Sequence, residues 1–143
     1  MQVIYQKRIP EELEIGAFSL FPKTVSDSDV MMFCGETGDL SPIYLDARFA
    51  GNTSLEAQTV PPMLIASMLG GAVYRLLSPD AYPLKREFEL LKPVHVGDTL
   101  TARAEITGVD KEKRQVTLLL EAYNSEKELV MKGTSLEQLV VRK

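Results

Sequence analysis

The densest group of polar side chains in this sequence lies at residues 37–44. The stretch reads TGDLSPIY and places Asp39 between a glycine and the pair Ser41-Pro42, with Tyr44 close behind. An aspartyl carboxylate is ionised at neutral pH and can act as a general base, whereas a phenol that titrates near pH 10 can donate a hydrogen bond. The stretch therefore predicts a polar site in which Asp39 faces a cavity.

A purely structural role for the same residues is the alternative. Asp and Ser ahead of a proline are ordinary turn residues, because their side chains bond to nearby backbone N–H groups. Asp39 would then form an Asx turn, and Tyr44 would be a half-buried aromatic. The sequence contains no glycine-rich phosphate loop after a strand, no HExxH and no G-x-S-x-G. Residue types alone leave both interpretations open.

The element expected to position such a site is a helix over residues 62–77. The run from Met63 to Leu77 is apolar on almost every side, prolines precede it, and Ser78-Pro79-Asp80 ends it. A helix that is apolar all round is expected to be buried on all sides. Gly70 and Gly71 cost about 1 kcal/mol each relative to Ala, which predicts that other backbone comes close there.

The second half of the chain changes to a period of two residues. Three long alternating segments joined by short turns predict an antiparallel meander, the last strand covering residues 128–141. The positions expected to face inward are Leu100, Ala102, Ala104 and Ile106, followed by Val116, Leu118, Leu120 and Ala122. Helices early and strands late indicate an α+β domain with the sheet wrapped around the long helix.

The first half predicts shorter elements. Residues 1–15 form an edge strand or an arm, and residues 18–21 form a strand limited by Pro22. Ser26 or Asp27 caps a helix whose apolar side comprises Val30, Met31, Phe33 and Cys34. Residues 46–50 make another helical turn.

Composition excludes several classes of protein. A chain of 143 residues with 45% hydrophobic and 25% charged residues is expected to form one domain, residues 1–143. The net charge of −4, without a basic stripe, argues against nucleic-acid binding. Cys34 is the sole cysteine, so neither a disulfide framework nor a cysteine metal cluster is expected. The apolar run is too short to span a membrane and contains Arg75; with no signal-peptide core, a cytoplasmic location is expected.

The stretch TGDLSPIYLDARFA resembles the signature Gly-Asp-x-Asn-Pro-x-His of the MaoC-like, (R)-specific enoyl-CoA hydratases. The likeness extends over nearly the whole chain: residues 12–16, 23–30, 63–67 and 88–98 resemble the family's lead-in, first strand and helix, central helix and Pro-Val-x-x-Gly-Asp strand. It implies the hotdog fold, in which a curved antiparallel sheet wraps a long central helix.

The resemblance also implies a chemistry. In these hydratases an Asp and a His hold the water that adds to an enoyl thioester, and a backbone N–H at the start of the central helix polarises the carbonyl. Asp39 matches the catalytic Asp, and Tyr44 stands at the His position. Ser41 replaces the usual Asn, and Pro62, which lacks an N–H, replaces the Gly before Met63.

Asp39 and Tyr44 are therefore the expected catalytic residues, and Ser41, Met63 and Ser67 the expected substrate-binding residues. Ser67 alternatively serves close helix packing. We expect Cys34 to be a small core residue and His95 to point to solvent or an interface, while Tyr74 and Tyr82 either line an acyl tunnel or cap the core.

Three functions stay open at this point: an enoyl-CoA hydratase or dehydratase-like lyase, a hotdog thioesterase, and a non-catalytic acyl-CoA-binding domain. The ligand is expected to be an acyl-CoA or acyl-carrier thioester. Neither a metal nor a cofactor is expected beyond the coenzyme A of the substrate. The resemblance further implies a homodimer or dimer-based oligomer with sites near its interface, which would cover an otherwise open sheet edge.

Overall fold

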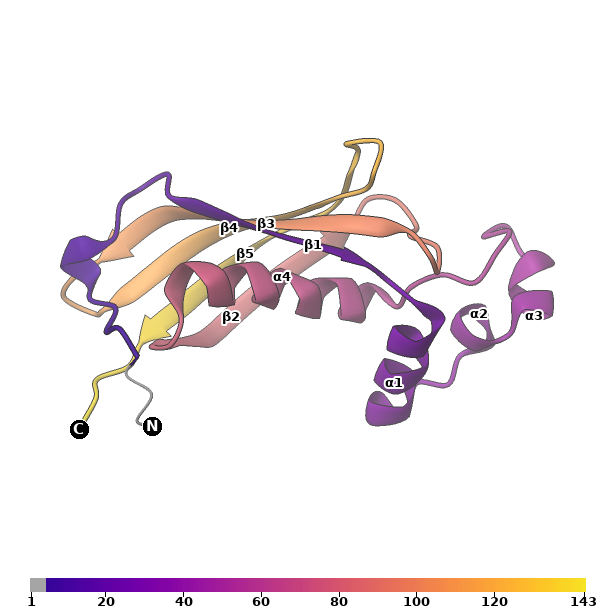
Figure 1. Cartoon of the computed structure of the whole chain (residues 1–143), viewed down its shortest axis with the longest axis horizontal. Helices are drawn as coiled ribbons and strands as arrows, with labels where there is room; N and C mark the ends of the chain where they lie inside the picture. Colours follow the sequence, from indigo (N-terminus) through magenta and orange to yellow (C-terminus); the bar gives the residue numbers. More distant parts are fainter. Residues whose placement is uncertain (1–4) are drawn as a thin grey trace.

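A computed structural model of the chain describes residues 5–143 as a five-stranded antiparallel sheet curved around one long helix (Figure 1). The helix is α4 (Pro62–Leu77), and the strands follow the order β1-β3-β4-β5-β2. The elements are the 3₁₀ turn η1 (Pro10–Glu12), β1 (Phe18–Thr24), α1 (Asp27–Thr37), α2 (Pro42–Leu45), α3 (Ala47–Gly51), α4, β2 (Ala81–Leu90), β3 (Thr99–Asp110), β4 (Gln115–Tyr123) and β5 (Leu129–Leu139). The predicted α+β architecture is confirmed.

The meander β3-β4-β5 forms the centre of the sheet, as the alternation predicts. Ala104 pairs with Leu120, and Leu120 in turn pairs with Gly133. All eight positions expected to face inward on the first two of these strands are buried. Alternation identifies them because one face of the sheet packs against α4 while the other meets solvent.

The two outer strands are longer than the sequence indicates. β1 continues through Pro22 to Thr24, and β2 begins at Ala81 rather than near residue 88. Both are edge strands, where a proline without an N–H is tolerated because one side of the strand has no partner. Pro22 pairs with Thr101, and the register of β2 shifts after Pro83.

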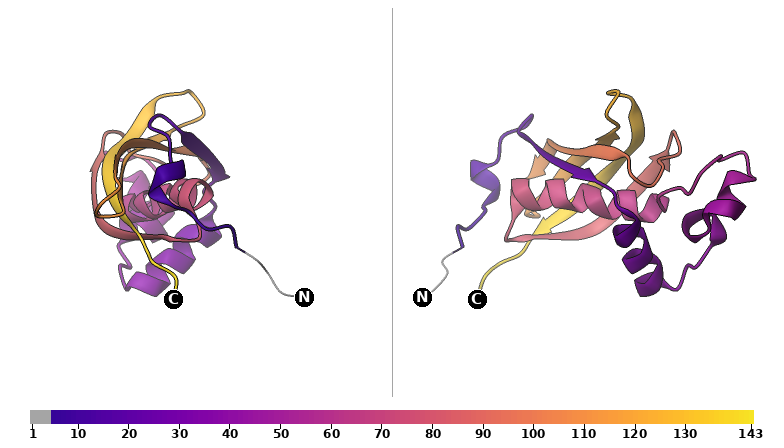
Figure 2. Two further views of the ribbon diagram at one scale, coloured as in Figure 1. Left: turned by 90° about the vertical axis from the view of Figure 1, so that its left-hand side faces the viewer. Right: turned by 45° about the vertical axis from the view of Figure 1, so that its right-hand side comes forward.

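Helix α4 is covered by the sheet on one side only. Ile65, Leu69 and Leu77 are buried, but Met63 and Tyr74 are 65% and 69% exposed. The end-on view in Figure 2 shows the sheet curving around α4 and leaving one side of the helix uncovered. The expectation of burial on all sides is therefore wrong for the single chain. An apolar face of a helix can pack against a second chain as well as against its own sheet, and the sequence does not distinguish the two.

Gly71 lies where a side chain packs closely against α4. A Cβ atom at this position would stand 2.8 Å from Cδ1 of Phe21, and one at Gly70 would stand 3.1 Å from Nη1 of Arg86. The expectation that backbone comes close at these glycines is wrong, because the close neighbours are side chains of β1 and β2.

We expect Gly71→Leu to destabilise the protein by about 1–3 kcal/mol or more, because the new side chain must displace the Phe21 ring from a packed interface. The matched control is Gly35→Leu in α1, where a Cβ would meet no atom within 4 Å. Urea unfolding of both variants measures the difference. An unchanged midpoint for Gly71→Leu would contradict the packing argument.

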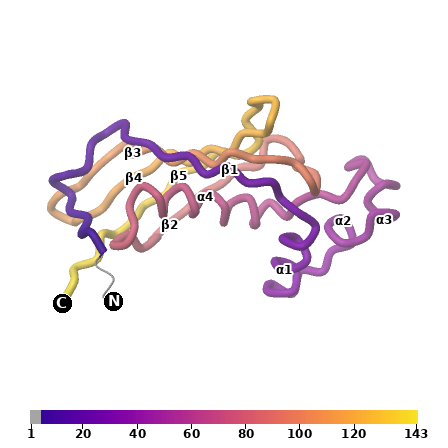
Figure 3. Tube along the Cα trace, in the orientation of Figure 1, coloured from indigo at the N-terminus to yellow at the C-terminus, as the bar shows by residue number. Residues whose placement is uncertain are grey.

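Helices α1 to α3 project beyond the N-terminal end of α4 (Figures 1 and 3). Ser26 caps α1 through a capping box with Asp29, as the sequence indicates. Val30 and Cys34 are buried, but Met31 is 57% exposed, so the apolar side of α1 is narrower than expected.

His95 ties this projecting segment to the sheet. Its side chain is half-buried rather than directed to solvent, and Nε2 lies 2.8 Å from the Leu55 carbonyl oxygen. One residue later, the Val96 amide donates to the Gln58 carbonyl, and the Gln58 side chain donates to the Tyr44 carbonyl. The expectation that His95 points to solvent is wrong, because the ring anchors the 55–58 loop. A position at an interface with another chain stays a prediction.

The described part of the N-terminal segment, residues 5–15, is an arm with one 3₁₀ turn and no strand; residues 1–4 of the predicted element lie outside the described residues. Asp80 holds it to the C-terminus. The buried Asp80 carboxylate accepts from the Arg142 guanidinium at 2.7 and 3.0 Å and from the Arg8 amide at 2.7 Å. Within residues 5–143, no helix is long and apolar enough to cross a membrane.

The Asp80 clamp predicts a pH-dependent stability. Hydrogen bonding by Arg142, with help from the Arg8 amide, lowers the pKa of Asp80 below its ordinary value. The stabilisation is therefore complete above about pH 4 and is lost as the pH falls through the lowered pKa. Asp80→Asn should lower the Tm by a few degrees at neutral pH, and the difference from wild type should shrink in strong acid. A Tm difference that is constant from neutral pH to strong acid would refute this. Asp110→Asn, at the exposed end of β3, is the control.

Candidate active site

A small cavity lies between the α2 segment and the start of α4. It measures about 160 Å³ and contains both Tyr44 and Pro62. Its lining is mostly apolar: Ile43, Tyr44, Leu55, Thr59, Val60, Pro62, Leu90, Pro93 and Val94. The Thr59 amide donates to the Ile43 carbonyl, and the Val60 amide to the Val94 carbonyl. These backbone bonds hold Tyr44, which stands at the family's His position, near the start of α4. Pro62, which stands at the family's Gly position, begins that helix.

Asp39 lies in the exposed loop between α1 and α2. Gly38 ends α1 in the left-handed conformation, with φ of 76°. The Asp39 amide donates to Thr37 Oγ1 at 3.2 Å, and Asp39 Oδ1 accepts from the Ser41 amide at 3.3 Å. Asp39 is thus held by an Asx turn. It does not line the cavity, so the expectation that its carboxylate faces one is wrong for the single chain.

Tyr44 is half-buried beside Asp39. Burial raises the pKa of the Tyr44 phenol, and the charge of Asp39 raises it further. The phenol therefore stays protonated at neutral pH and can donate a hydrogen bond. Within residues 5–143 the hydroxyl of Tyr44 makes no hydrogen bond, and that donor can therefore meet a water or a ligand.

The start of α4 presents one backbone donor. Pro62 has no N–H, and the amides of Leu64 and Ile65 both donate to the Pro61 carbonyl. The Met63 amide is therefore the first N–H of α4 that has no acceptor within the helix, at the end where the helix dipole is positive. This arrangement can stabilise a negative oxygen.

The two serines of the predicted site differ in their surroundings. Ser41 precedes α2, and its carbonyl accepts from the Tyr44 amide at 3.0 Å. Ser67 is exposed on the uncovered side of α4, and its hydroxyl donates to the Met63 carbonyl at 2.8 Å. Because that proton is already used, the Ser67 oxygen can only accept from a ligand. Substrate binding by Ser41, Met63 and Ser67 stays a prediction.

Cys34 is a neighbour that the sequence assigns only to the core. Its side chain is 1% exposed, as expected for a small core residue. Burial, followed by the nearby charge of Asp39, raises the pKa of the Cys34 thiol. Cys34 therefore stays a neutral thiol beneath the Asp39 loop. The sequence spacing predicts only that Cys34 lies one helical turn before Gly38, next to Asp39. The Gly38 amide donates to the Cys34 carbonyl at 2.9 Å.

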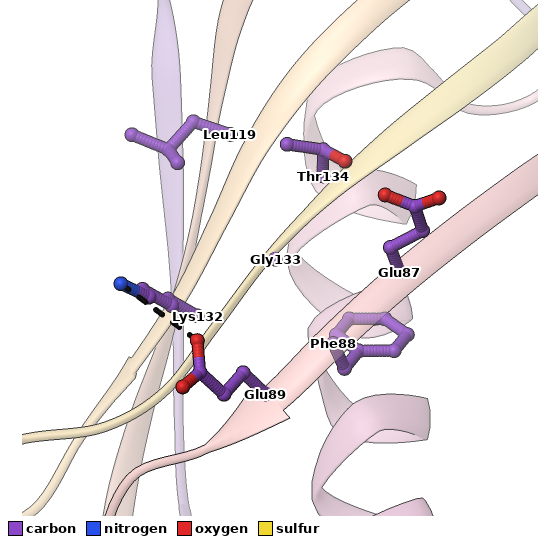
Figure 4. Close-up of a pocket in the computed structure, with 7 residues that line it drawn as sticks. All are labelled: Glu87, Phe88, Glu89, Leu119, Lys132, Gly133 and Thr134. Atoms are coloured by element: carbon purple, nitrogen blue, oxygen red, sulfur yellow. Dashed lines mark ion pairs between the residues drawn. The ribbon is translucent and has the colours of Figure 1, made fainter.

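Two larger hollows have none of these residues in their lining. One, on the sheet between β5 and β2, measures about 340 Å³ and is bordered by Glu87, Glu89 and Lys132 (Figure 4). Glu89 and Lys132 form an ion pair across it at 3.8 Å. A second hollow of about 610 Å³ lies between α1 and the 56–58 loop. Neither contains a residue of the predicted site.

The MaoC like domain matches residues 15–128. This chain belongs to the MaoC-like domain family. It is 31% identical over 108 residues to an (R)-specific enoyl-CoA hydratase of Rhodospirillum rubrum, covering 75% of each protein. A 3-hydroxybutyryl-CoA dehydratase of Methylorubrum extorquens is 29% identical over 109 residues, which cover 76% of this chain and 69% of that protein.

Solved structures confirm the hotdog fold of this MaoC-like chain. The (R)-hydratase from A. caviae involved in PHA biosynthesis superposes with a TM-score of 0.86 and 27% sequence identity. The match covers 91% of this chain and 99% of that structure. The resemblance seen in the TGDLSPIY stretch is therefore confirmed over the whole domain.

Proposed function

We propose that this MaoC-like protein is an enoyl-CoA hydratase-like lyase. It adds water across the double bond of a trans-2-enoyl thioester, or removes it in the reverse direction. The hydroxyl oxygen of water bonds to C3, and a proton is delivered to C2. The relatives named above as a hydratase and a dehydratase of CoA thioesters support this reaction.

The single observation that carries the proposal is that Tyr44 lines a cavity with Pro62 at the start of α4, while Asp39 is close enough for its charge to raise the pKa of Tyr44. As the water oxygen bonds to C3, Asp39 takes a proton from the water, and the protonated Asp39 then gives that proton to C2. Tyr44 donates a hydrogen bond that orients the water or the substrate, and the Met63 amide faces the thioester oxygen as negative charge develops. The reaction consists of C–O bond formation assisted by proton transfer and hydrogen bonds, without a change of oxidation state, so it requires no cofactor beyond the thioester carrier.

Binding of an acyl thioester without turnover is the second candidate. Two observations favour it: a protonated phenol replaces the histidine base, and the donor at residue 62 is absent because Pro62 lacks an N–H. Losing a general acid or base typically costs about 10²–10⁴-fold in rate, and losing one oxyanion donor about 10²–10³-fold. The first proposal requires that Asp39 and the Met63 amide compensate.

One assay separates these candidates. The purified protein is incubated with crotonyl-CoA and with longer trans-2-enoyl-CoAs, while loss of the conjugated double bond and release of thiol are followed together. Loss of the double bond without thiol supports hydration, and release of thiol indicates a thioesterase. Saturable binding with neither product supports the second candidate.

We further propose that two copies form a homodimer with the sites near its interface. Asp39 is exposed outside the cavity, and the uncovered face of α4 carries the large apolar side chains of Met63 and Tyr74. Beside it, the edge strand β2 exposes Tyr82 and Leu84, which are 63% and 50% accessible. A second copy that covers this face would bury apolar surface and enclose Asp39.

Sedimentation velocity at micromolar concentration tests the dimer. The wild type is expected to sediment as a dimer, and Tyr74→Glu should shift it toward the monomer by placing a charge in the apolar interface. Ile15→Glu is the matched control, because Ile15 is 64% exposed but lies before β1, outside the α4 face. A clean wild-type monomer would contradict the proposal.

A further inference from the structure

A buried ion pair lies under the C-terminal half of α4, away from the site described above. Glu137 on β5 is 0% exposed. Its Oε1 atom accepts from Arg86 Nε at 3.2 Å, from Arg86 Nη2 at 2.5 Å and from Ser135 Oγ at 2.7 Å. Its other oxygen, Oε2, is buried and meets no hydrogen-bond donor within residues 5–143.

This pair borders a cavity of about 220 Å³. The cavity is lined by Gly70, Val73 and Tyr74 of α4, by the chain that leads into β2, and by Arg86 and Glu137. Pockets that hold a whole small ligand usually measure about 300–1,000 Å³. A cavity of this size therefore suits one end of a ligand rather than all of it.

The side of α4 that the sheet leaves uncovered, and that the second copy of the proposed dimer would cover, runs from the start of the helix past this cavity. Gly70 and Tyr74 lie on the same side as Met63 and the exposed Ser67. With a helical rise of 1.5 Å per residue, the cavity lies about 10–16 Å along α4 from Met63. An extended hydrocarbon chain of C–C bonds about 1.5 Å long advances about 1.3 Å per bond, so roughly eight to twelve bonds cover this distance.

The polar atoms of the cavity select the kind of group that fits. Glu137 Oε2 needs a hydrogen-bond donor, because a buried carboxylate oxygen without one is costly. The Arg86 Nη1 amino group can donate to an acceptor. It lies beside Gly70, 3.1 Å from the point where a Cβ atom on that residue would stand. The ion pair is neutral as a whole, so a carboxylate would be repelled by Glu137 and an ammonium group by Arg86. A hydroxyl both donates and accepts without a charge.

We propose that Arg86 and Glu137 form a subsite for the hydroxyl-bearing end of the acyl chain. The assignment to an acyl chain rests on the proposed function, whereas the polarity of the subsite rests on the cavity alone. The protein would then act on enoyl thioesters of medium length whose far end carries a hydroxyl group.

The test compares trans-dec-2-enoyl-CoA with its ω-hydroxy and ω-carboxy counterparts as substrates of the wild-type protein. We expect kcat/KM for the ω-hydroxy chain to exceed both others by about tenfold or more, as hydrogen bonds to charged groups allow. Equal values, or a preference for the plain or the carboxylated chain, would overturn the proposal.

Two variants separate ligand recognition from a purely structural ion pair. The double variant Arg86→Met/Glu137→Leu removes both charges together and leaves no buried charge alone. In this variant kcat/KM should be higher for the plain chain than for the ω-hydroxy chain. A purely structural ion pair would leave the ratio of the two kcat/KM values unchanged. Glu137→Gln, close to isosteric, should lower the preference for the hydroxyl if the double variant fails to fold. An unchanged ratio in a folded variant would overturn the proposal.

Failure of the proposed function remains distinguishable from failure of the subsite. If no enoyl-CoA is hydrated, calorimetry with decanoyl-CoA and ω-hydroxydecanoyl-CoA measures the subsite by itself. Binding that is about tenfold tighter for the hydroxylated chain would support the subsite while the hydratase proposal falls. Equal dissociation constants would refute the subsite.

Discussion

Asp39→Asn is expected to lower kcat for enoyl-CoA hydration by about 10²–10⁴-fold, the usual cost of removing a general base. The fold should survive, because the Asp39 side chain is exposed and Oδ1 accepts one hydrogen bond, from the Ser41 amide at 3.3 Å. An asparagine oxygen accepts the same bond. The KM and the Tm should therefore stay close to those of the wild type, while the proton acceptor is lost.

The chain provides a matched control for this substitution. Asp46 is exposed in the same projecting segment, and its Oδ1 caps α3 by accepting from the Phe49 amide at 3.0 Å. Asn caps a helix about as well as Asp, so Asp46→Asn should keep both activity and Tm. Steady-state kinetics and thermal unfolding of the two variants decide the matter. Wild-type turnover by Asp39→Asn would end the hydratase proposal and leave thioester binding.

Tyr44 is expected to contribute less than Asp39. Its protonated phenol orients water or substrate but does not accept the proton, so Tyr44→Phe should give the smaller loss. Tyr44→His should raise the rate of hydration, because imidazole is a base near neutral pH. The gain would remain limited by Pro62, which lacks an N–H.

The sequence predicts those parts of this fold in which one face of an element meets solvent. In β3 and β4 the alternation identifies the buried positions because polar residues occupy the other face. In α4 the same reasoning fails, since an apolar side chain such as Met63 looks the same whether its own sheet or a second chain is to cover it. The position of Asp39 was likewise predictable from its motif, but its distance from the cavity depends on how α2 packs against the start of α4.

The cluster at Glu137 shows a different limit. The inward face of β5 carries Gly133, Ser135 and Glu137 between the buried Met131 and Leu139, so its apolar alternation is interrupted in the middle of the strand. The polar residues are tolerated there because Arg86, 51 residues away in sequence, neutralises Glu137. Local propensity contains no information about such a partner, and only the pairing of β2 with β5 brings the two side chains together.

Gly133→Ala is expected to be the most destabilising single change in the sheet. A Cβ at this position would stand 2.0 Å from the backbone oxygen of Glu87 and 2.7 Å from Cδ1 of Phe88, the residue that pairs with Gly133. A ring can rotate aside, but a backbone carbonyl on a paired strand moves only if β2 separates from β5. Figure 4 shows the two strands side by side, with Gly133 on β5 and Phe88 on β2. Overpacking usually costs about 1–3 kcal/mol, and displaced backbone places this variant at or above the upper end.

Gly108→Ala is the control for this prediction, because Gly108 also lies in a strand and a Cβ there would meet Thr117 Cβ at an ordinary 3.6 Å. Urea unfolding followed by circular dichroism should give a large fall in midpoint for Gly133→Ala and little change for Gly108→Ala. Equal midpoints would contradict the close contact between β5 and β2. Since β2 carries Arg86 and borders the uncovered face of α4, a displaced β2 should also weaken dimer formation, which sedimentation of the folded variant measures.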